Sequence, residues 1–405
     1  MPFRLALSGL NAASADLSVT ANNIANSSTS GFKESRAEFA ELFAVSAQGV
    51  ATLTPGNGVR VSDIAQQFSQ GNIDFTDNSL DLAISGTGFF TVSDNGSYAY
   101  TRAGAFRTDA GGYVVNAQGQ RLQVFPPVAG GGFNTGSLAD LRLVTSESAP
   151  QATSNVELLA NLPSDAVPPT NPTFDPTDPT SFTRATSLTV YDSLGAAHTG
   201  TVYFVKDAAP GEWTTHFYID GNDVGTTPGI TFDNMGRLVD PNPAELNFPA
   251  YAPATGAADM TIAINVAGTT QYGSVFSVGN ITQDGYTTGR LIGIDIDKAG
   301  VVQARFTNGR SSILGQVALS NFANPNGLQQ LADTSWAETF GSGQALRGQA
   351  GSSGFGLVQS GALEASNVDI TTQLVNMITA QRNFQANAKM ISTSDAITQT
   401  IINIR

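Results

Sequence analysis

Apolar residues recur every seven positions near the beginning of the chain, a spacing typical of a helix that packs along another helix. Small residues follow three positions after them, which would let a partner helix approach closely. The pattern predicts a helix over residues 1–28. Taken alone, the stretch equally fits a core helix of a globular domain. The four apolar positions are Phe3, Leu10, Leu17 and Ile24.

A second apolar stripe with the same spacing lies near the other end of the chain. The sequence Ser-Asn-Val-Asp before it resembles a capping box, with Ser366 as the N-cap and Asp369 at the N3 position. Gly and Pro are absent from there onward, so a helix over residues 362–405 is expected. Because each stripe needs a partner, the two helices are expected to pair as a coiled coil. The members of the second stripe are Ile370, Met377, Phe384 and Ile391.

Between these ends, apolar and polar residues alternate with the period of half-buried strands. Asp-x-x-Gly recurs, and there Asp suits the start of a type I turn while Gly suits the positive φ that follows it. The chain is therefore predicted to be mainly β between two long helices. The alternation involves Met260, Ile262, Ile264 and Val266, and then Ile292, Ile294 and Ile296. The turns are expected at Asp109–Gly112, Asp192–Gly195, Asp233–Gly236 and Asp297–Gly300.

Two stretches rich in turn-forming residues indicate boundaries within this multidomain chain. Residues 162–179 are crowded with Pro, Asp, Asn and Thr, and we expect a linker or surface excursion that marks the entry to an outer β domain. Residues 341–361 are rich in Gly and separate the last strands from the second helix.

Charge and composition exclude several classes of function. Acidic residues outnumber basic ones by 33 to 19, and the net charge of −14 repels phosphate backbones and anionic lipids, so no nucleic acid is expected as a partner. No run approaches the ~18 apolar residues of a membrane span, and the first residues lack the sustained apolar core of a secretory signal. We therefore expect neither membrane insertion nor a cleaved signal peptide. The chain has no Cys, which excludes disulfides and cysteine nucleophiles.

Candidate chemistry is sparse. The two histidines, His198 and His216, have no neighbours at a recognisable metal or triad spacing, so we interpret both as structural. Gly86-Thr87-Gly88 lacks the third Gly of a dinucleotide loop and is interpreted as a tight turn. The residues around Gly221 hint at a calcium loop, but no acidic residue closes the ring, so a β-turn is expected. The sequence thus predicts no catalytic residue, no cofactor and no metal site.

Segments spread along the chain resemble the bacterial flagellar rod and hook proteins, which form the axial family. Residues 21–33, ANNIANSSTSGFK, look like the signature of that family, and residues 366–405 are similar to its terminal helix. The segments DLAISGTGFFTV, YTRAGAF and GALEASNVD also match. TSLTVYDSLG and YGSVFSVGNITQDGY look more like the hook members than the much shorter distal rod members. Residues 221–256 show no motif of the family.

The resemblance implies a layered organisation. The terminal helices would line an innermost tube, residues 29–70 would be a partly extended connector, and residues 71–147 with 284–361 would form an inner β domain. Residues 148–283 would form an outer β domain inserted between them. The family motif falls on Asn22, Asn23, Asn26, Gly31, Phe32 and Lys33.

By the same resemblance, the chain would polymerise with itself into a curved, flexible tube that couples motor torque to the filament and encloses an export channel. Its implied partners are the distal rod protein, the hook cap protein, the hook-filament junction protein and the flagellar type III export apparatus. Its implied location is extracellular, in the flagellum. The alternatives are a rod protein of the same family, a secreted β-rich adhesin or surface protein, and a secreted hydrolase. For the hydrolase, the sequence offers no constellation of acid, base or metal-binding residues.

Overall fold

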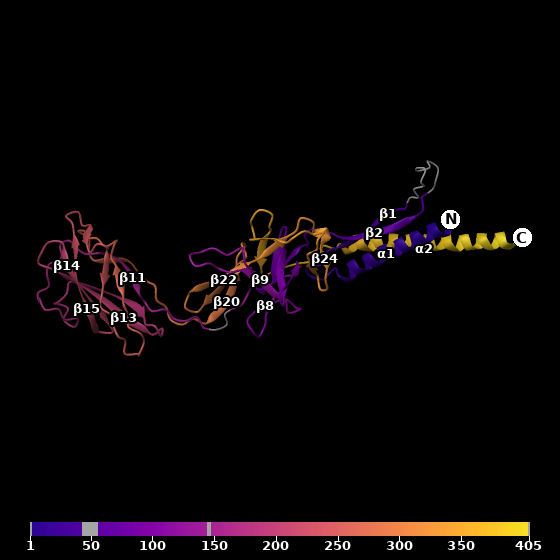
Figure 1. Cartoon of the computed structure of the whole chain (residues 1–405). Coiled ribbons are helices and arrows are strands. Elements are labelled where there is room, and N and C mark those ends of the chain that lie inside the picture. Colours follow the sequence, from indigo (N-terminus) through magenta and orange to yellow (C-terminus); the bar gives the residue numbers. More distant parts are fainter. Residues whose placement is uncertain (1, 43–55, 144–146, 404–405) are drawn as a thin grey trace. The chain divides into compact units, whose positions relative to one another are not determined.

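The computed structural model describes residues 2–42, 56–143 and 147–403, which fold into two compact units (Figure 1). The sequence placed the outer domain at residues 148–283, whereas the second unit extends further and includes a short return segment. The first unit comprises Met1–Thr145, Gly293–Arg305 and Ser311–Arg405, and the second comprises Ser146–Ile292 and Phe306–Arg310.

Helices α1 (Pro2–Ala25) and α2 (Ile370–Asn403) lie side by side in the first unit (Figure 1). The predicted pairing of the two terminal helices is therefore confirmed. Small residues set their separation, since a Cβ added at Gly9 would lie 2.6 Å from Oδ1 of Asn387. The buried residues are Ala6, Ala12, Ala13, Val19, Thr20 and Asn23 in α1, and Gln373 and Ala380 in α2.

The cap of α2 differs from the expected one. Oδ1 of Asp369 accepts hydrogen bonds from the backbone N–H groups of Thr371 (2.7 Å) and Thr372 (3.2 Å), so Asp369 is the N-cap. The prediction that Ser366 caps the helix is wrong, because its hydroxyl accepts from the N–H of Val368 in the non-helical segment before α2.

The connector expected at residues 29–70 contains a two-stranded antiparallel sheet. Strands β1 (Ser35–Glu41) and β2 (Val59–Gln66) pair along their lengths, with an irregularity between Glu38 and Phe39. Residues 43–55 of the connector lie outside the described residues.

The β part of the first unit is built on one large sheet, whose main path runs β20-β21-β22-β9-β5-β6-β25-β24. Alternate residues of its central strands, such as Phe90, Val92, Leu122 and Val124, are buried in one core. Two small sheets, β4-β27 and β3-β28, join segments far apart in the sequence. The elements are β3 (Ile73–Phe75), β4 (Leu82–Ser85), β5 (Phe89–Asp94), β6 (Ser97–Thr101), β7 (Arg107–Thr108), β8 (Val114–Val115), β9 (Arg121–Phe125), β10 (Ala139–Asp140), β20 (Leu291–Ile296), β21 (Val301–Phe306), β22 (Ser311–Val317), β23 (Leu319–Asn321), the short 3-10 helix η1 (Pro325–Gly327), β24 (Gln329–Gln330), β25 (Ser335–Ala337), β26 (Leu346–Gly348), β27 (Leu357–Ser360) and β28 (Ala362–Glu364).

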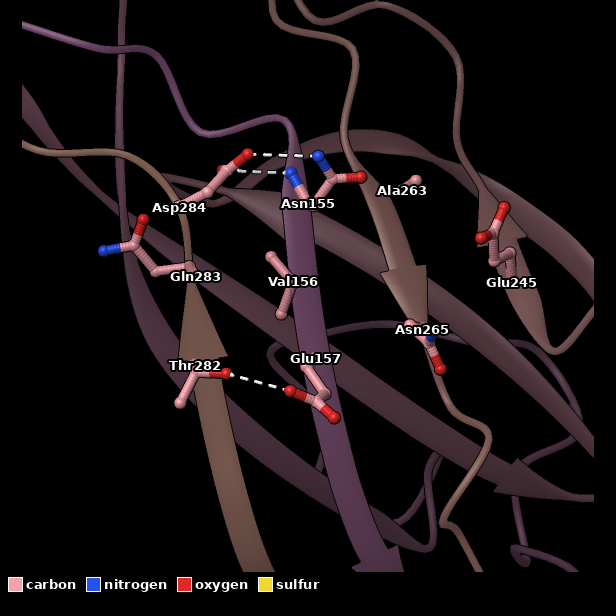
Figure 2. A pocket seen from close by; sticks show the side chains of 9 residues that line it. All are labelled: Asn155, Val156, Glu157, Glu245, Ala263, Asn265, Thr282, Gln283 and Asp284. Atoms are coloured by element: carbon pink, nitrogen blue, oxygen red, sulfur yellow. Dashed lines mark hydrogen bonds between the residues drawn. The ribbon is translucent and has the colours of Figure 1, made fainter. Parts of the chain in front are cut away.

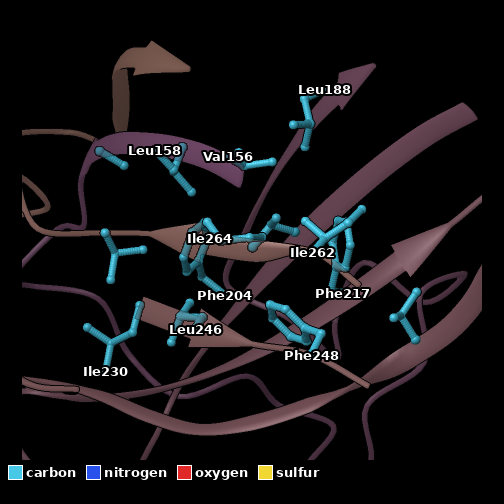
Figure 3. Close-up of a cluster of buried hydrophobic side chains, with 14 of the residues drawn as sticks. Val156, Leu158, Leu188, Phe204, Phe217, Ile230, Leu246, Phe248, Ile262 and Ile264 are labelled. Atoms are coloured by element: carbon cyan, nitrogen blue, oxygen red, sulfur yellow. The ribbon is translucent and has the colours of Figure 1, made fainter. Parts of the chain in front are cut away.

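The second unit consists of two sheets that enclose one apolar core, part of which Figure 3 shows. Met260, Ile262, Ile264 and Val266 are all buried in it, as their alternation predicted, whereas Ile292 is exposed in β20. One sheet has the order β17-β18-β11-β19 and the other β12-β13-β14-β15-β16. The strands are β11 (Asn155–Asn161), β12 (Arg184–Tyr191), β13 (Ala197–Lys206), β14 (Glu212–Ile219), β15 (Asn222–Phe232), β16 (Leu238–Asp240), β17 (Glu245–Asn247), β18 (Ala263–Asn265) and β19 (Ser277–Gln283).

The Asp-x-x-Gly turns share one geometry, as predicted. In each, the N–H of the Gly donates to the carbonyl of the Asp, and the Asp N–H donates to the carbonyl four residues later. The Gly residues adopt φ between 74° and 85°, where a Cβ would be strained. The same four-residue signal therefore closes hairpins in both units.

The Pro-rich stretch does not mark the entry to the second unit. Residues 162–179 follow β11, which already belongs to that unit, and they lead to β12. Phe174 from this stretch stacks on His216 with ring centroids 3.9 Å apart, so the stretch covers a sheet face. Its Pro content favours an irregular surface path, which does not require a domain boundary.

Candidate functional site

The candidate catalytic features have structural roles. His198 lies between two carboxylates, with Nδ1 2.6 Å from Oδ2 of Asp220 and Nε2 3.3 Å from Oδ2 of Asp192. Gly86–Gly88 form the turn from β4 to β5, and Asp220-Gly221 form a two-residue turn with positive φ at both positions, as the sequence predicted. Within the described part of the chain, no group of three or more His, Cys, Asp or Glu side chains is arranged to hold a metal ion.

A polar groove of about 440 Å³ crosses the end of the β17-β18-β11-β19 sheet (Figure 2). Its best-placed carboxylate, Asp284, accepts hydrogen bonds from the backbone N–H groups of Ser154 (2.8 Å) and Asn155 (3.0 Å) and from their side chains. Burial raises the pKa of Asp284, but these bonds outweigh it and lower the pKa to about 2. The carboxylate is saturated with donors, so it fixes the start of β11 and is not a general base.

The family motif after α1 forms a hydrogen-bonded junction with the start of α2. The side chain of Asn23 binds both backbone groups of Ser35, accepting from its N–H (3.0 Å) and donating to its carbonyl (2.8 Å). The same amide donates to Oε1 of Gln373 at 3.3 Å, and Gln373 donates to Glu34 at 2.7 Å. Asn367 accepts from the N–H of Glu34 at 2.8 Å. The end of α1, the first residues of the connector and the start of α2 are thus tied together.

Gly31 lies at the end of the turn that follows the first helix. Its φ is +71°, and an added Cβ would clash with the backbone nitrogen of Ala103. Both observations require Gly at this position. Its N–H donates to the carbonyl of Glu364 at 2.8 Å, and the next residue, Phe32, is buried. The backbone of the motif therefore packs directly on the β body of the first unit.

A buried cluster of three charged side chains lies beside this point. Nζ of Lys33 is 2.6 Å from Oε1 of Glu364 and donates to the carbonyl of Ser69 at 2.7 Å. On the other side of the carboxylate, Nη1 of Arg102 is 3.0 Å from Oε2, and Nη2 donates to the carbonyl of Gly86 at 2.8 Å. The side chains of Lys33 and Glu364 are completely inaccessible to solvent. Glu364 is thus the common partner of two cations.

Burial and pairing oppose each other in this cluster. Burial lowers the pKa of Lys33, and the carboxylate of Glu364 acts against this by stabilising the charged form. The pKa of Arg102 is likewise lowered by burial, with Glu364 opposing the shift. Nε of Arg102 is buried without a hydrogen-bond partner. Because removal of one partner would leave another charge buried and unpaired, the cluster makes the junction intolerant of change.

The cluster brings together four of the sequence segments that carry the family resemblance. Lys33 comes from the first signature, Gly86 from DLAISGTGFFTV, Arg102 from YTRAGAF and Glu364 from GALEASNVD. Sequence reasoning did not select Arg102, Glu364, Asn367 or Gln373. The available signal was a charged residue with uncharged neighbours on both sides, as Arg102 is in YTRAGAF and Glu364 is in GALEASNVD. Of the six motif residues, Asn22 and Asn26 bond only within the end of α1 and its following turn.

The eight residues expected to pack the helices differ in their environment within one chain. Leu10, Leu17 and Ile24 of α1 are half-buried, as are Met377, Phe384 and Ile391 of α2. Phe3 and Ile370 are each 49% exposed. Among the helices that the structure describes, none is long and apolar enough to cross a membrane.

Paired terminal helices, a β body tied to them by buried charges, and an inserted β unit define a structural assembly subunit. Family models match in chain order: flagella basal body rod protein (residues 3–33), flagellar hook protein FlgE/F/G D1 domain (83–158), flagellar basal body protein FlaE D2 domain (161–286) and flagellar basal body rod FlgEFG protein C-terminal (359–404). The chain is similar over its full length to the flagellar hook protein FlgE of Salmonella typhimurium (38% identical) and, at 39%, of Escherichia coli, each covered completely. It belongs to the flagellar hook protein family.

A solved structure agrees with this fold. The flagellar hook protein FlgE2 of Helicobacter pylori matches with a TM-score of 0.54 at 13% identity, covering 72% of this chain and 100% of that one. The chain is therefore a structural protein of the bacterial flagellar hook, a homopolymeric assembly, and is not an enzyme. The resemblance seen in the sequence is confirmed, and the rod, adhesin and hydrolase alternatives are set aside.

Proposed function

We propose that α1 and α2 form the innermost layer of the hook tube and that the apolar residues which one chain leaves exposed on them are buried by neighbouring copies. The observation that carries this proposal is the apolar surface which one chain leaves uncovered on both helices. Contacts that do not close into a ring give an open helical polymer, so repeated packing of such helices builds a tube around a channel. The exposed residues include Phe3, Leu5 and Leu7 of α1 and Ile370, Leu374, Val375 and Ile378 of α2.

In this proposal the junction around Glu364 transmits force between the helical layer and the β body. The buried ion pairs and the Asn23 clamp support this role, because they join α1, α2 and the body through short bonds. The second unit forms an outer layer whose contacts between copies are weak and exchangeable, so the tube can bend while it turns. The tube couples torque from the rod to the filament.

We infer the partners of the tube from the family resemblance. At one end the tube meets the distal rod protein, and at the other the hook cap protein and later the hook-filament junction protein. The flagellar type III export apparatus delivers the subunits through the channel. Removal of the first twenty or so residues would delete most of α1, so we propose that export leaves them in place. Mass spectrometry of the assembled protein should find a chain that begins at or within a residue of Met1.

Electron microscopy of the purified protein tests the central proposal. Under conditions that favour association, such as high salt that screens the net charge of −14, we expect hollow helical tubes. A reconstruction should place α1 and α2 at the channel wall. Tubes in which the helices lie on the outer surface, or aggregates without helical order, would contradict it.

A further inference from the structure

Phe340 is a bulky apolar side chain that the first unit leaves entirely uncovered, with a relative exposure of 106%. It lies in the turn between β25 and β26, and hydrogen bonds make that turn rigid. The Ser342 hydroxyl accepts from the N–H of Thr339 at 2.9 Å, and the Thr339 hydroxyl donates to the carbonyl of Gly327. Ser342 is buried, so the base of the turn is anchored while its tip projects. A fixed, exposed aromatic ring has the properties of a docking residue.

The same unit has an open groove of about 520 Å³ at the other end of β26. Four glycines, Gly86, Gly351, Gly354 and Gly356, contribute to its lining, so few side chains occupy it. Phe355 and Leu357 supply apolar walls, and Leu357 is itself exposed. The remaining lining residues, Ser85 and Thr87, are small, so the groove suits a flat aromatic ring.

Charged residues are few at both features on a strongly acidic protein, and the one nearest to Phe340 in the sequence is Glu338, which directly precedes the turn. No Asp, Glu, Lys or Arg occurs in residues 339–346 or 348–363, or in residues 82–93. Two copies that each carry a net charge of −14 repel each other, so a contact between them is least costly where charged residues are few. This favours a second copy of the chain as the occupant of the groove.

We propose that Phe340 of one copy inserts into the groove around Phe355 and Leu357 of the next copy in the polymer. The inference rests on the proposed assembly and adds a specific contact to it. Because the turn before β26 and the loop after it lie at opposite ends of that strand, each copy presents both halves of the contact in different places. Such a heterologous contact leaves a free Phe340 and a free groove at the two ends, as continued growth requires.

Disulfide trapping tests the contact directly, because the chain has no Cys of its own. Polymers of a variant with Phe340→Cys and Leu357→Cys should, after mild oxidation, give a ladder of dimers, trimers and longer species on a non-reducing gel. The matched control pairs Phe340→Cys with Val167→Cys, an exposed position in the second unit, and should give no ladder. Well-formed polymers of the first variant without a ladder would overturn the proposal. So would dimers from Phe340→Cys alone, which indicate a symmetric contact between two such turns.

A second variant separates assembly from folding. Phe340→Ser should leave the thermal unfolding of the monomer unchanged, because the side chain is fully exposed there. It should raise the concentration needed for polymerisation about tenfold, the effect expected when one large apolar side chain no longer becomes buried. Polymerisation at the wild-type concentration would overturn the contact. Failure of the wild-type protein to form tubes would instead count against the proposed assembly.

Discussion

The helix pair of the first unit and the two-sheet core of the second unit differ in how much of their apolar surface is buried within one chain. In the second unit the large side chains Phe204, Trp213 and Phe217 are fully buried within one chain. In the helix pair, half of the buried residues are alanines, while larger residues such as Leu5 and Ile378 stay exposed. The second unit is therefore complete by itself, whereas the helix pair has apolar surface left for other copies.

The difference is also one of free energy. Burial of apolar area contributes about 25 cal/mol per Å², so a helix seam with few large buried side chains is stabilised much less than a core that buries large aliphatic and aromatic side chains. A close-packed seam does define the separation and register of the helices. We infer that the helices gain most of their stability on assembly, while the second unit folds beforehand.

The largest effect is expected from a charge placed among the half-buried residues between the two helices. Phe384→Asp or Leu17→Asp should abolish polymerisation, because an unpaired carboxylate in a packed apolar interface carries a large desolvation cost. Electron microscopy measures the loss of tubes, and circular dichroism should show the β signal unchanged. The conservative variant Phe384→Leu serves as the control and should still form tubes. Normal tubes from either Asp variant would mean that these residues are not in the polymer core.

Removal of the second unit tests the other side of the comparison. Its two ends are adjacent, since Ser148 and Gly289 pair as an antiparallel bridge with a 2.7 Å hydrogen bond from the N–H of Ser148. Replacement of residues 149–288 by a short Gly/Ser linker should therefore leave the first unit folded and able to assemble. We expect straight tubes and poor motility, measured by micrographs and swimming assays.

The contrary outcomes of that replacement are distinct. Normally curved tubes would place the origin of curvature in the first unit. Absence of tubes, with the first unit folded, would mean that the second unit is needed for assembly and would contradict the layered arrangement.

The sequence predicted features that depend on local pattern. Heptad spacing predicted both helices, period-two alternation predicted the burial of Met260 to Val266, and Asp-x-x-Gly predicted the hairpin turns. Each of these signals is complete within a single helix, strand or turn. The matching segments also indicated the family, because they occur at widely separated places along the chain.

Apart from the pairing of the terminal helices, features that depend on distant contacts were not predicted. Glu364 and Lys33 are 331 positions apart, and nothing in either segment alone indicates that they pair. The N-cap was assigned to Ser366 because the capping-box pattern fits there, yet the helix begins later, after Asn367 has bonded to Gln67 and Ser69. The Pro-rich stretch was interpreted as a boundary from its composition. Its packing on the sheet through Phe174 is a tertiary contact, which no local pattern indicates.

A further difference between the units is that the first depends on the buried ion pairs of Glu364 with Lys33 and Arg102. Glu364→Gln removes the negative charge and leaves Lys33 and Arg102 close together without a carboxylate. Breaking such a buried pair typically costs about 3–5 kcal/mol, so the first unit should unfold at much lower denaturant concentration. The matched control is Glu38→Gln, which breaks the exposed pair with Arg36 and should have little effect. An unchanged denaturation midpoint for Glu364→Gln would contradict the role of the cluster.

The smallest expected effect lies in the second unit, where His198 links the Asp192 turn to the Asp220 turn. Both ring nitrogens face carboxylate oxygens, so the ring can donate two hydrogen bonds only when it is protonated. Burial acts to lower the pKa of His198, but the bonds to Asp220 and Asp192 outweigh it and raise the pKa above its ordinary value of 6.5. The stabilisation is therefore complete below pH 6.5 and is lost as the pH rises through the raised pKa.

At acidic pH, protonation of the Asp192 carboxylate limits the stability of the second unit. Burial raises the pKa of Asp192, but hydrogen bonds from Thr255, Ala196 and His198 outweigh it and lower the pKa to about 2. Its contribution is present above the ordinary value of 3.8 and is lost as the pH falls toward 2. The two groups together should make the stability of the second unit greatest at mildly acidic pH. His216 also titrates in this unit, with a pKa that burial lowers.

Urea unfolding of the full chain between pH 4 and 9, followed by the fluorescence of Trp213 in the second unit with Trp336→Phe as the background, measures this pH dependence. We expect the second unit to lose about 1.5–3 kcal/mol above pH 6.5, the scale of a hydrogen bond to a charged group. His198→Gln should remove that loss. The control His216→Gln should keep it, because burial lowers the pKa of His216 and places its titration below 6.5. If the wild-type protein is equally stable at pH 6 and pH 9, His198 is not protonated between its two carboxylates, and the second unit owes its stability to its apolar core alone.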